Sequence, residues 1–234
     1  MCKGVMVKFI TLTNTGYIDY TLNCLKSLEN IKCDIKLHCY CIGKIGCDRL
    51  IENGYLCSSI DNESNSNFQK FRTGNWSNIT FNKFKIIYEN LLHNEYVCFT
   101  DGDIVYENTM FIQYLLDNIN DNDMLIQNDS CDNNSDSNLC SGFMFIKSNP
   151  NTLLLFNPKT MEHNQNTKNW DDQVYINEIK HKLKYQKLPL NLFPNGEYYY
   201  KNSHKITPYL IHFNWLIGHQ KKSKMQDYNK WFLI

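Results

Sequence analysis

The segment Tyr96–Tyr106, which reads YVCFTDGDIVY, constrains the fold more than any other part of this sequence. The run from Tyr96 to Thr100 predicts a hydrophobic β-strand. Asp101 and Asp103 follow this strand, and residues two apart in an extended chain point to the same side. Two carboxylates held this close repel each other unless a cation lies between them or one takes up a proton. The segment therefore predicts a strand that ends at a ligand site.

The two carboxylates favour a hard divalent cation. Oxygen ligands suit Mg²⁺ or Mn²⁺, which usually keep open positions for substrate phosphates. Gly102 lets the backbone turn sharply and approach a ligand closely. A solvated acidic turn is the alternative that a bare Asp-x-Asp leaves open. The apolar pair Ile104-Val105, which follows the acids, favours the site.

Strands and helices alternate along the chain. The expected strands are Val5–Thr13, Ile35–Ile42, Tyr96–Thr100, Met124–Gln127, Leu139–Ser148 and Pro208–Trp215. The expected helices are Tyr20–Leu28, Cys47–Asn53, Asn78–His93, Met110–Ile119, Leu153–His163 and Trp170–Leu183. This alternation predicts an α/β sandwich with a mostly parallel sheet. A chain of 234 residues without an internal linker is expected to form one domain, residues 1–234.

Composition excludes several classes of protein. The 24 Lys and Arg balance the 24 Asp and Glu, so we do not expect the chain to bind nucleic acid or an acidic membrane through its net charge. Ten cysteines occur without any Cys-x-x-Cys pair, which disfavours a zinc site or a disulfide framework and predicts reduced core thiols. The N-terminal residues resemble neither a signal peptide nor an anchor, and no stretch approaches the ~18 apolar residues that span a bilayer. We therefore expect a cytoplasmic protein.

Four polar features stand in order along the chain. They are the loop Thr11–Thr15 after the first strand, Asp101-Gly102-Asp103 after the central strand, the helix start Trp170-Asp171-Asp172-Gln173, and a tail with His212, Gly218, Lys221 and Lys222. In an open α/β sheet, ligands lie beyond the carboxyl ends of the strands. The first two features lie at such ends, so the chain is expected to bind its ligand there.

This order resembles the GT-A glycosyltransferases that use nucleotide-diphosphate sugars. It looks most like the retaining branch that includes glycogenin and the bacterial lipopolysaccharide galactosyltransferases. The matching residues are Asp101-Gly102-Asp103, Cys140-Ser141-Gly142, Asp172-Gln173, and His212 followed by Gly218 and Lys221 or Lys222. The resemblance covers most of the chain in order, and its specificity lies in these short motifs.

The resemblance implies both a fold and an activity. The fold would be a GT-A (Rossmann-like) α/β/α sandwich with a mostly parallel, mixed central sheet. Residues 1–105 would form the nucleotide-binding half, and residues 106–234 would complete the metal and acceptor sites. The activity would be metal-dependent transfer of a sugar, with retention favoured, from a nucleotide-diphosphate donor to a hydroxyl of a glycan, protein or lipid. A UDP-sugar is the favoured donor, and Mn²⁺ or Mg²⁺ the expected cofactor.

The resemblance also implies roles for single residues. Asp101, Asp103 and His212 would hold the metal, and Asp101 would also contact the ribose. The expected donor-binding residues are Thr11, Thr13, Lys85, Asp101, Gly102, Ser141, Gly142, Gly218, Lys221 and Lys222. Asp172 and Gln173 would face the donor sugar and the acceptor.

Some of these roles have alternatives. An inverting reaction would need a general base, for which Asp171 or Asp172 is the candidate. Both acids also suit a helix start for purely structural reasons. Lys83 and Lys85 lie on the helix that precedes the central strand, where one could reach a phosphate, although we expect both to face solvent.

Other readings of the motifs remain open. The tail departs from the family pattern, because Gly218 stands far from His212 and no Pro follows the lysines, so the sequence does not choose between Lys221 and Lys222. Phe99–Val105 also fits the nucleophile motif of haloacid-dehalogenase-type phosphatases, with Asp101 as nucleophile, although that motif normally lies on the first strand. A non-catalytic domain that binds nucleotide sugars is a third alternative.

Overall fold

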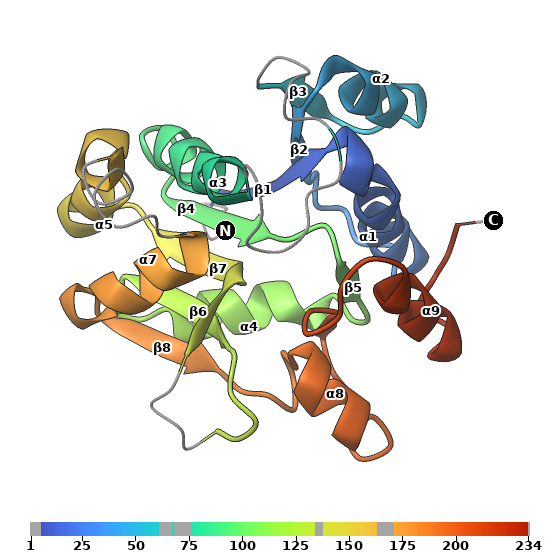
Figure 1. The fold of residues 1–234 in the computed structure, drawn as a ribbon. Helices are drawn as coiled ribbons and strands as arrows, with labels where there is room; N and C mark the ends of the chain where they lie inside the picture. Colours follow the sequence, from blue (N-terminus) through green and yellow to red (C-terminus); the bar gives the residue numbers. More distant parts are fainter. Residues whose placement is uncertain (1–5, 61–66, 68–75, 134–137, 163–170, 234) are drawn as a thin grey trace.

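A seven-stranded sheet forms the centre of the molecule (Figure 1). The computed structural model describes residues 6–60, 67, 76–133, 138–162 and 171–233. The strand order is β3-β2-β1-β4-β7-β6-β8. The strands are β1 (Val7–Asn14), β2 (His38–Ile42), β3 (Cys57–Ser59), β4 (Tyr96–Thr100), β6 (Met124–Asn128), β7 (Leu139–Lys147) and β8 (Tyr185–Leu188).

The strand directions make the sheet mixed and mostly parallel. Neighbours among β1, β2, β3 and β4 pair in parallel, as do β6 and β8. β7 runs antiparallel to both β4 and β6. The expected α/β fold class is therefore confirmed. A mixed sheet was expected, but the sequence did not indicate that β7 is the antiparallel strand, because hydrophobic periodicity carries no information on strand direction.

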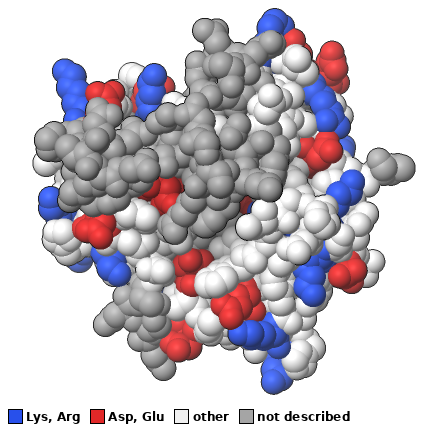
Figure 2. Space-filling view, in the orientation of Figure 1, with Lys and Arg blue, Asp and Glu red and all other residues white. Residues whose placement is uncertain are grey.

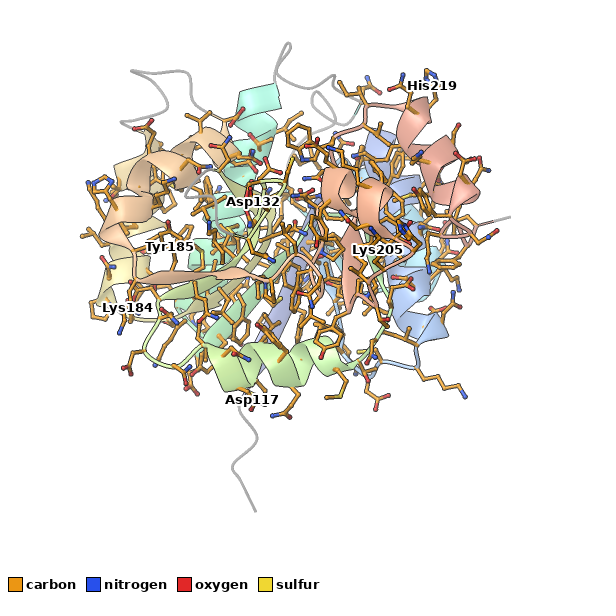
Figure 3. The ribbon with its side chains drawn as sticks, turned by 90° about the horizontal axis from the view of Figure 1, so that it is seen from below. Asp117, Asp132, Lys184, Tyr185, Lys205 and His219 are labelled. Atoms are coloured by element: carbon orange, nitrogen blue, oxygen red, sulfur yellow. The ribbon has the colours of Figure 1, made fainter. Side chains whose placement is uncertain are left out.

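β4 shows why both faces of the sheet are covered by helices. Its side chains alternate: Val97 and Phe99 enter one apolar core, whereas Tyr96 and Cys98 enter the other. The first core lies against α3 (Trp76–Leu91), α5 (Pro150–Leu155) and α7 (Asp172–Ile179). The second lies against α1 (Ile18–Asn30), α2 (Lys44–Glu52) and α4 (Met110–Asn118), whose Asp117 points away from the sheet in Figure 3. A strand buried on both faces reads as a continuous hydrophobic run.

A two-stranded antiparallel ribbon brings the tail of the chain to the end of β4. β5 (Ile104–Tyr106) follows Asp103 directly, and β9 (Leu210–His212) pairs with it so that Ile104 lies opposite His212. Val105 and Ile211 belong to a third apolar core, which also includes residues of α8 (Gly196–Asn202) and α9 (His219–Asp227). The ribbon therefore sets His212 beside the two carboxylates.

The helices after β7 differ from the sequence prediction. One helix was expected over Leu153–His163, but α5 ends at Leu155, and a second helical stretch covers residues 158–162. His163 lies outside the described residues, as does Trp170 of the expected helix Trp170–Leu183. That helix is shorter than expected: α7 spans Asp172–Ile179, and a short 3₁₀ turn follows it at Lys180–Lys182.

Several short elements were not expected. They are β3, β5, β8, α8 and α9, whereas the 3₁₀ turn at Thr15–Tyr17 falls where a turn was expected after the first strand. β8 follows Lys184 and forms one edge of the sheet beside β6 (Figure 1). β3, β5 and β8 have only three or four residues, which present too few periodic positions to be recognised from the sequence.

Charges of both signs are interspersed on the visible face of the molecule (Figure 2). This agrees with the balanced composition. Among the described residues of the face in Figure 2, neither positive nor negative side chains form a continuous patch. Among the helices formed by the described residues, none combines the length and the apolar surface that crossing a bilayer requires.

Candidate functional site

A cavity of about 590 Å³ lies at the carboxyl ends of β1 and β4. Its lining comes from elements far apart in the sequence. The lining residues include Thr13, Tyr17, Lys83, Asp101, Gly102, Asp103, Asp129, Cys140, Ser141, Asp171, Asp172, Gln173, His212, Asn214, Trp215, Ile217, Gly218 and Lys221. Most of the residues that the sequence singled out therefore share one cavity, at the place where open α/β sheets bind ligands.

Asp101, Asp103 and His212 form a compact group. One ligand atom from each residue lies within 4.8 Å of the other two. His212 Nε2 is 3.2 Å from Asp103 Oδ1 and 3.8 Å from Asp101 Oδ2. Asp103 and His212 are almost completely buried, at 4% and 2% exposure. The structure thus brings together the three residues expected to hold a metal.

Gln127 orients the His212 ring, a role that the sequence did not suggest. The Gln127 Nε2 amide donates to the carbonyl oxygens of Phe193 (3.2 Å) and Pro194 (3.1 Å), which leaves its Oε1 to face His212. Oε1 lies 2.7 Å from His212 Nδ1, so Nδ1 carries the donated hydrogen. Nε2 is then directed at the two carboxylates. Metal-binding histidines are commonly oriented by such a partner on the second ring nitrogen.

The electrostatics of this group suit a cation. Burial opposes charge on His212, but Asp103 and Cys140 outweigh it and raise the pKa of the imidazole well above its usual range. Burial also raises the pKa of Asp101, and Asp103 adds to this effect, while Lys83 opposes it. The site therefore draws positive charge to Nε2, and a divalent ion can take the place of that proton. Two carboxylates and one imidazole are a donor set that fits Mn²⁺ or Mg²⁺.

Gly142 allows this group to pack closely. A Cβ atom at this position would lie 2.3 Å from His212 Cε1 and 2.7 Å from Asp101 Oδ2. The Gly142 carbonyl also accepts from the Asp101 backbone N–H at 2.7 Å. Gly102 is needed for a similar reason, because its Cβ would lie 2.5 Å from Thr21 Oγ1 on α1. Gly142 therefore lets the backbone of β7 pack closely against Asp101 and His212, and Gly102 lets the turn after β4 pack closely against α1.

Lys83 corrects the sequence prediction, since it is only 4% exposed instead of facing solvent. Its Nζ lies 2.5 Å from Asp172 Oδ2 and 3.1 Å from Asp101 Oδ1. It also donates to the carbonyl and hydroxyl oxygens of Ser141, and Ser141 Oγ donates to Asp172 at 2.7 Å. Burial lowers the pKa of Lys83, but the two carboxylates outweigh burial and raise it, so the ammonium stays charged. Lys83 lies one helical turn from Thr80 and from Ile87, which are both buried. This spacing places Lys83 on the buried face of α3, and it is the sequence pattern that indicates its burial.

Lys85, which we expected to bind the donor, lies elsewhere. Its side chain is exposed on the other side of α3 and lines a small separate cavity with Ile60, Asn82 and Glu89. The geometry therefore favours Lys83 over Lys85 as the lysine of this helix that acts in the site.

Lys221 closes the opposite wall of the cavity. It forms a buried ion pair with Asp103, and its Nζ donates to the Tyr17 hydroxyl at 2.5 Å. The Asp103 carboxylate is desolvated, yet Lys221 and His212 outweigh burial and hold its pKa below the usual range. Lys222 instead places its Nζ 4.6 Å from the centre of the Trp231 ring and is exposed. The geometry therefore favours Lys221 over Lys222. Tyr17 was not singled out by the sequence.

The other expected donor-binding residues fall into two groups. Thr13, Ser141 and Gly218 line the cavity, and Gly218 precedes α9 with a φ of 54°. Thr11 is fully buried and is not among the lining residues. Its side chain therefore reaches a ligand only if the surrounding backbone moves.

The start of α7 carries two roles. Asp171 caps the helix by accepting from the Val174 backbone N–H at 2.8 Å, which supports the structural alternative for this residue. Gln173 lines the cavity and donates from Nε2 to Asp129 Oδ2 at 2.9 Å. Asp129, which follows β6, is a further lining residue that the sequence did not single out, because its segment has no periodicity.

Comparison with known proteins agrees with this geometry. Residues 45–227 match the family model of the nucleotide-diphospho-sugar transferases. The UDP-galactose:fucoside alpha-3-galactosyltransferase of Dictyostelium discoideum is 28% identical, in an alignment that takes in 97% of this chain and 43% of that protein. The chain thus spans less than half the length of this relative.

Solved structures share the fold. The galactosyltransferase LgtC, in complex with donor and acceptor sugar analogues, has a TM-score of 0.60 at 13% identity, covering 88% of this chain and 86% of LgtC. A glycosyltransferase involved in glycosylation of the major capsid of PBCV-1 also has a TM-score of 0.60, at 11% identity over 94% and 98% of the two chains. The GT-A fold is confirmed, and the chain belongs to the nucleotide-diphospho-sugar transferase family.

Proposed function

We propose that this chain is a metal-dependent glycosyltransferase. It transfers a sugar from a nucleotide-diphosphate donor, with a UDP-sugar favoured, to the hydroxyl of a glycan, protein or lipid. The observation that carries the proposal is the convergence of Asp101, Asp103 and His212 with the buried Lys221 in one cavity. Mn²⁺ or Mg²⁺ bound by the three ligands would neutralise charge on the diphosphate as a Lewis acid.

The residues around the metal ligands have separate tasks in this proposal. Lys221 stabilises the negative charge that grows on the departing diphosphate. Lys83 holds Asp101 and Asp172 in place and offsets their charge. Thr13 lines the part of the cavity at the end of β1, where the nucleoside is expected. Gln173 and Asp172 face the sugar to be transferred.

The state of the two candidate bases favours retention of the anomeric configuration. Asp172 Oδ2 already accepts from Lys83 and from Ser141, and Asp171 Oδ1 accepts from the start of α7. Both carboxylates are thus held by contacts within the protein, so neither can turn toward an acceptor hydroxyl unless these contacts break. These contacts support a retaining reaction, which NMR of the product anomer checks directly.

The alternative readings lose support. Family membership speaks against a phosphatase, and so does the lowered pKa of Asp103, because that mechanism needs an acid beside the nucleophile Asp101. A non-catalytic sugar-nucleotide-binding domain would bind the same ligands without turnover. The cytoplasmic location stays a prediction, which the free thiols of nine described cysteines support.

A thermal-shift screen with nucleotide diphosphates and UDP-sugars, with and without Mn²⁺, tests the proposal. We expect at least one nucleotide diphosphate to stabilise the protein only when the metal is present, and Asp103→Ala to abolish this effect. Asp117→Ala, on the outward face of α4, is the matched control and should behave as the wild type. Equal stabilisation of Asp103→Ala and the wild type would refute the ligand assignment.

A further inference from the structure

Trp215 has an unusual position at the rim of the cavity. Its side chain is 56% exposed, although it lines the cavity, and its backbone φ is 65°. A bulky residue in the left-handed region is a genuine outlier. Such strain persists only where the surrounding structure holds it, and it concentrates at ligand sites. Trp215 therefore combines a strained backbone with an exposed indole at the rim of the cavity.

Four hydrogen bonds hold Trp215 and its neighbours. The Trp215 Nε1–H donates to Asp129 Oδ1 at 3.1 Å, and Asn214 Nδ2 donates to the same oxygen at 3.2 Å. The Asn214 Oδ1 atom accepts from the Gly196 backbone N–H at 2.7 Å. The Phe213 backbone N–H donates to the Asp103 carbonyl at 3.1 Å, directly beside the proposed metal site. The ring is thus fixed relative to the metal ligands.

Asp129 makes this rim polar as well as aromatic. Its Oδ2 accepts from Gln173 Nε2 at 2.9 Å, so three neutral donors from two segments of the chain surround one carboxylate. Gln173 and Asp129 both line the cavity, on the side where the sugar is expected to be transferred. Carboxylate and amide oxygens there can accept hydrogen bonds from several hydroxyl groups at once.

The combination of groups selects one kind of ligand. A pyranose ring presents an apolar C–H face and an edge of hydroxyl groups, which match an indole face and a carboxylate-amide pair. An acyl chain would cover the indole but would take Asp129 and Gln173 out of water without offering a hydrogen-bond donor to their remaining lone pairs. A serine or threonine hydroxyl would offer no apolar ring face to Trp215. Ile217, also exposed, extends the apolar rim.

We propose that Trp215, held by Asp129, is the platform on which a saccharide acceptor stacks, so that the acceptor is a glycan. This inference rests on the proposed function, because it assigns the second substrate of that reaction. Trp215 binds the ring face of the acceptor, and Asp129 with Gln173 binds its hydroxyl groups. The stacked sugar then presents one hydroxyl to the donor.

Kinetics on the full chain test the inference. Transfer from a UDP-sugar with Mn²⁺ is measured with methyl glycosides of common hexoses and with serine- and threonine-containing peptides as acceptors. The variants are Trp215→Ala, Trp215→Phe and, as control, Leu154→Ala, which removes an equally exposed side chain of α5 that does not line the cavity.

We expect the wild type to use at least one glycoside. Trp215→Ala should raise the KM for that glycoside by roughly tenfold or more, since it removes an aromatic stacking contact. The KM for the UDP-sugar should change by less than about twofold. General damage to the fold would instead raise the KM values for both substrates. Trp215→Phe should retain most of the acceptor affinity, and Leu154→Ala should match the wild type.

Two results would overturn the inference while the proposed function stands. One is an unchanged glycoside KM in Trp215→Ala, and the other is transfer to peptides with no glycoside used. If no nucleotide diphosphate stabilises the wild type with Mn²⁺, the proposed function itself fails, and the inference fails with it. The thermal-shift screen therefore separates the two failures.

Discussion

The two walls of the cavity each hold a buried lysine, and the two lysines have different surroundings. Lys83, on α3, lies between two carboxylates, Asp101 and Asp172, and also donates to Ser141. Lys221, on α9, pairs with Asp103 and donates to Tyr17. The carboxylate beside Lys221 is also a proposed metal ligand. A cation there would compete with the ammonium for that carboxylate, which leaves the ammonium available to a diphosphate. In the proposed function, Lys83 therefore holds the site together, whereas Lys221 binds the substrate.

The largest effect is expected on removing Lys83. Lys83→Met leaves Asp101 and Asp172 facing each other with little solvent, because the Asp172 side chain is buried. Breaking a buried ion pair from one side costs about 3–5 kcal/mol of the free energy of unfolding. Urea denaturation measures this loss. Lys85→Met, on the exposed side of the same helix, should change the stability by less than about 0.5 kcal/mol.

A double variant sharpens this prediction. Lys83→Met with Asp172→Asn removes one of the two uncompensated charges and should recover part of the lost stability. If Lys83→Met alone were as stable as the wild type, Lys83 would not stabilise this side of the cavity. The proposed difference between a structural Lys83 and a substrate-binding Lys221 would then be wrong.

A smaller effect is expected for Lys221, and mainly on substrate. Lys221→Met should lower donor turnover by about a hundredfold, because it removes one of the groups that stabilise the departing diphosphate. Lys222→Met is the matched control, since the neighbouring ammonium lies over Trp231. Steady-state kinetics with a UDP-sugar and Mn²⁺ check both variants. If both variants lost the same share of donor turnover, the reaction would depend on positive charge in this region in general and not on the position of Lys221.

The same contrast shows how far the sequence alone can lead. Asp101 and Asp103 were identified because a strand and its end are local features, readable over a few residues. His212 was identified through the resemblance of the tail. Lys83 was wrongly expected in solvent, because lysines on helices are mostly exposed and the two carboxylates that bury it lie far along the chain.

Residues that act through distant partners left no local signal. Gln127 and His212 are 85 positions apart, and so are Asp129 and Asn214. Tyr17 meets Lys221 over 204 positions. Such pairs depend on how the ribbon of β5 and β9 carries the tail to the end of β4. β9 lies within the strand expected over Pro208–Trp215, but β5 has only three residues and shows no period, so the pairing of the two strands could not be predicted.

The smallest effect is expected at Gln127, which acts on the cation site only through His212. Gln127→Leu removes the acceptor for the Nδ1 hydrogen and leaves the Phe193 and Pro194 carbonyls without that donor. Loss of a group that orients a metal ligand typically lowers metal affinity by about 10–100-fold. Titration of Mn²⁺ in the presence of UDP, followed by the thermal shift, measures this affinity.

Gln127 differs from the two lysines because a high concentration of Mn²⁺ should compensate for its replacement. The three metal ligands remain in Gln127→Leu, so excess Mn²⁺ should restore the stabilisation by UDP, whereas it should not restore donor turnover in Lys221→Met. Gln113→Leu, on the exposed face of α4, is the control for loss of an amide. An unchanged Mn²⁺ affinity in Gln127→Leu would mean that packing against Gly142 and Asp103 suffices to orient His212. Recovery at high Mn²⁺ would instead place Gln127 among the residues that position the site without touching the substrate.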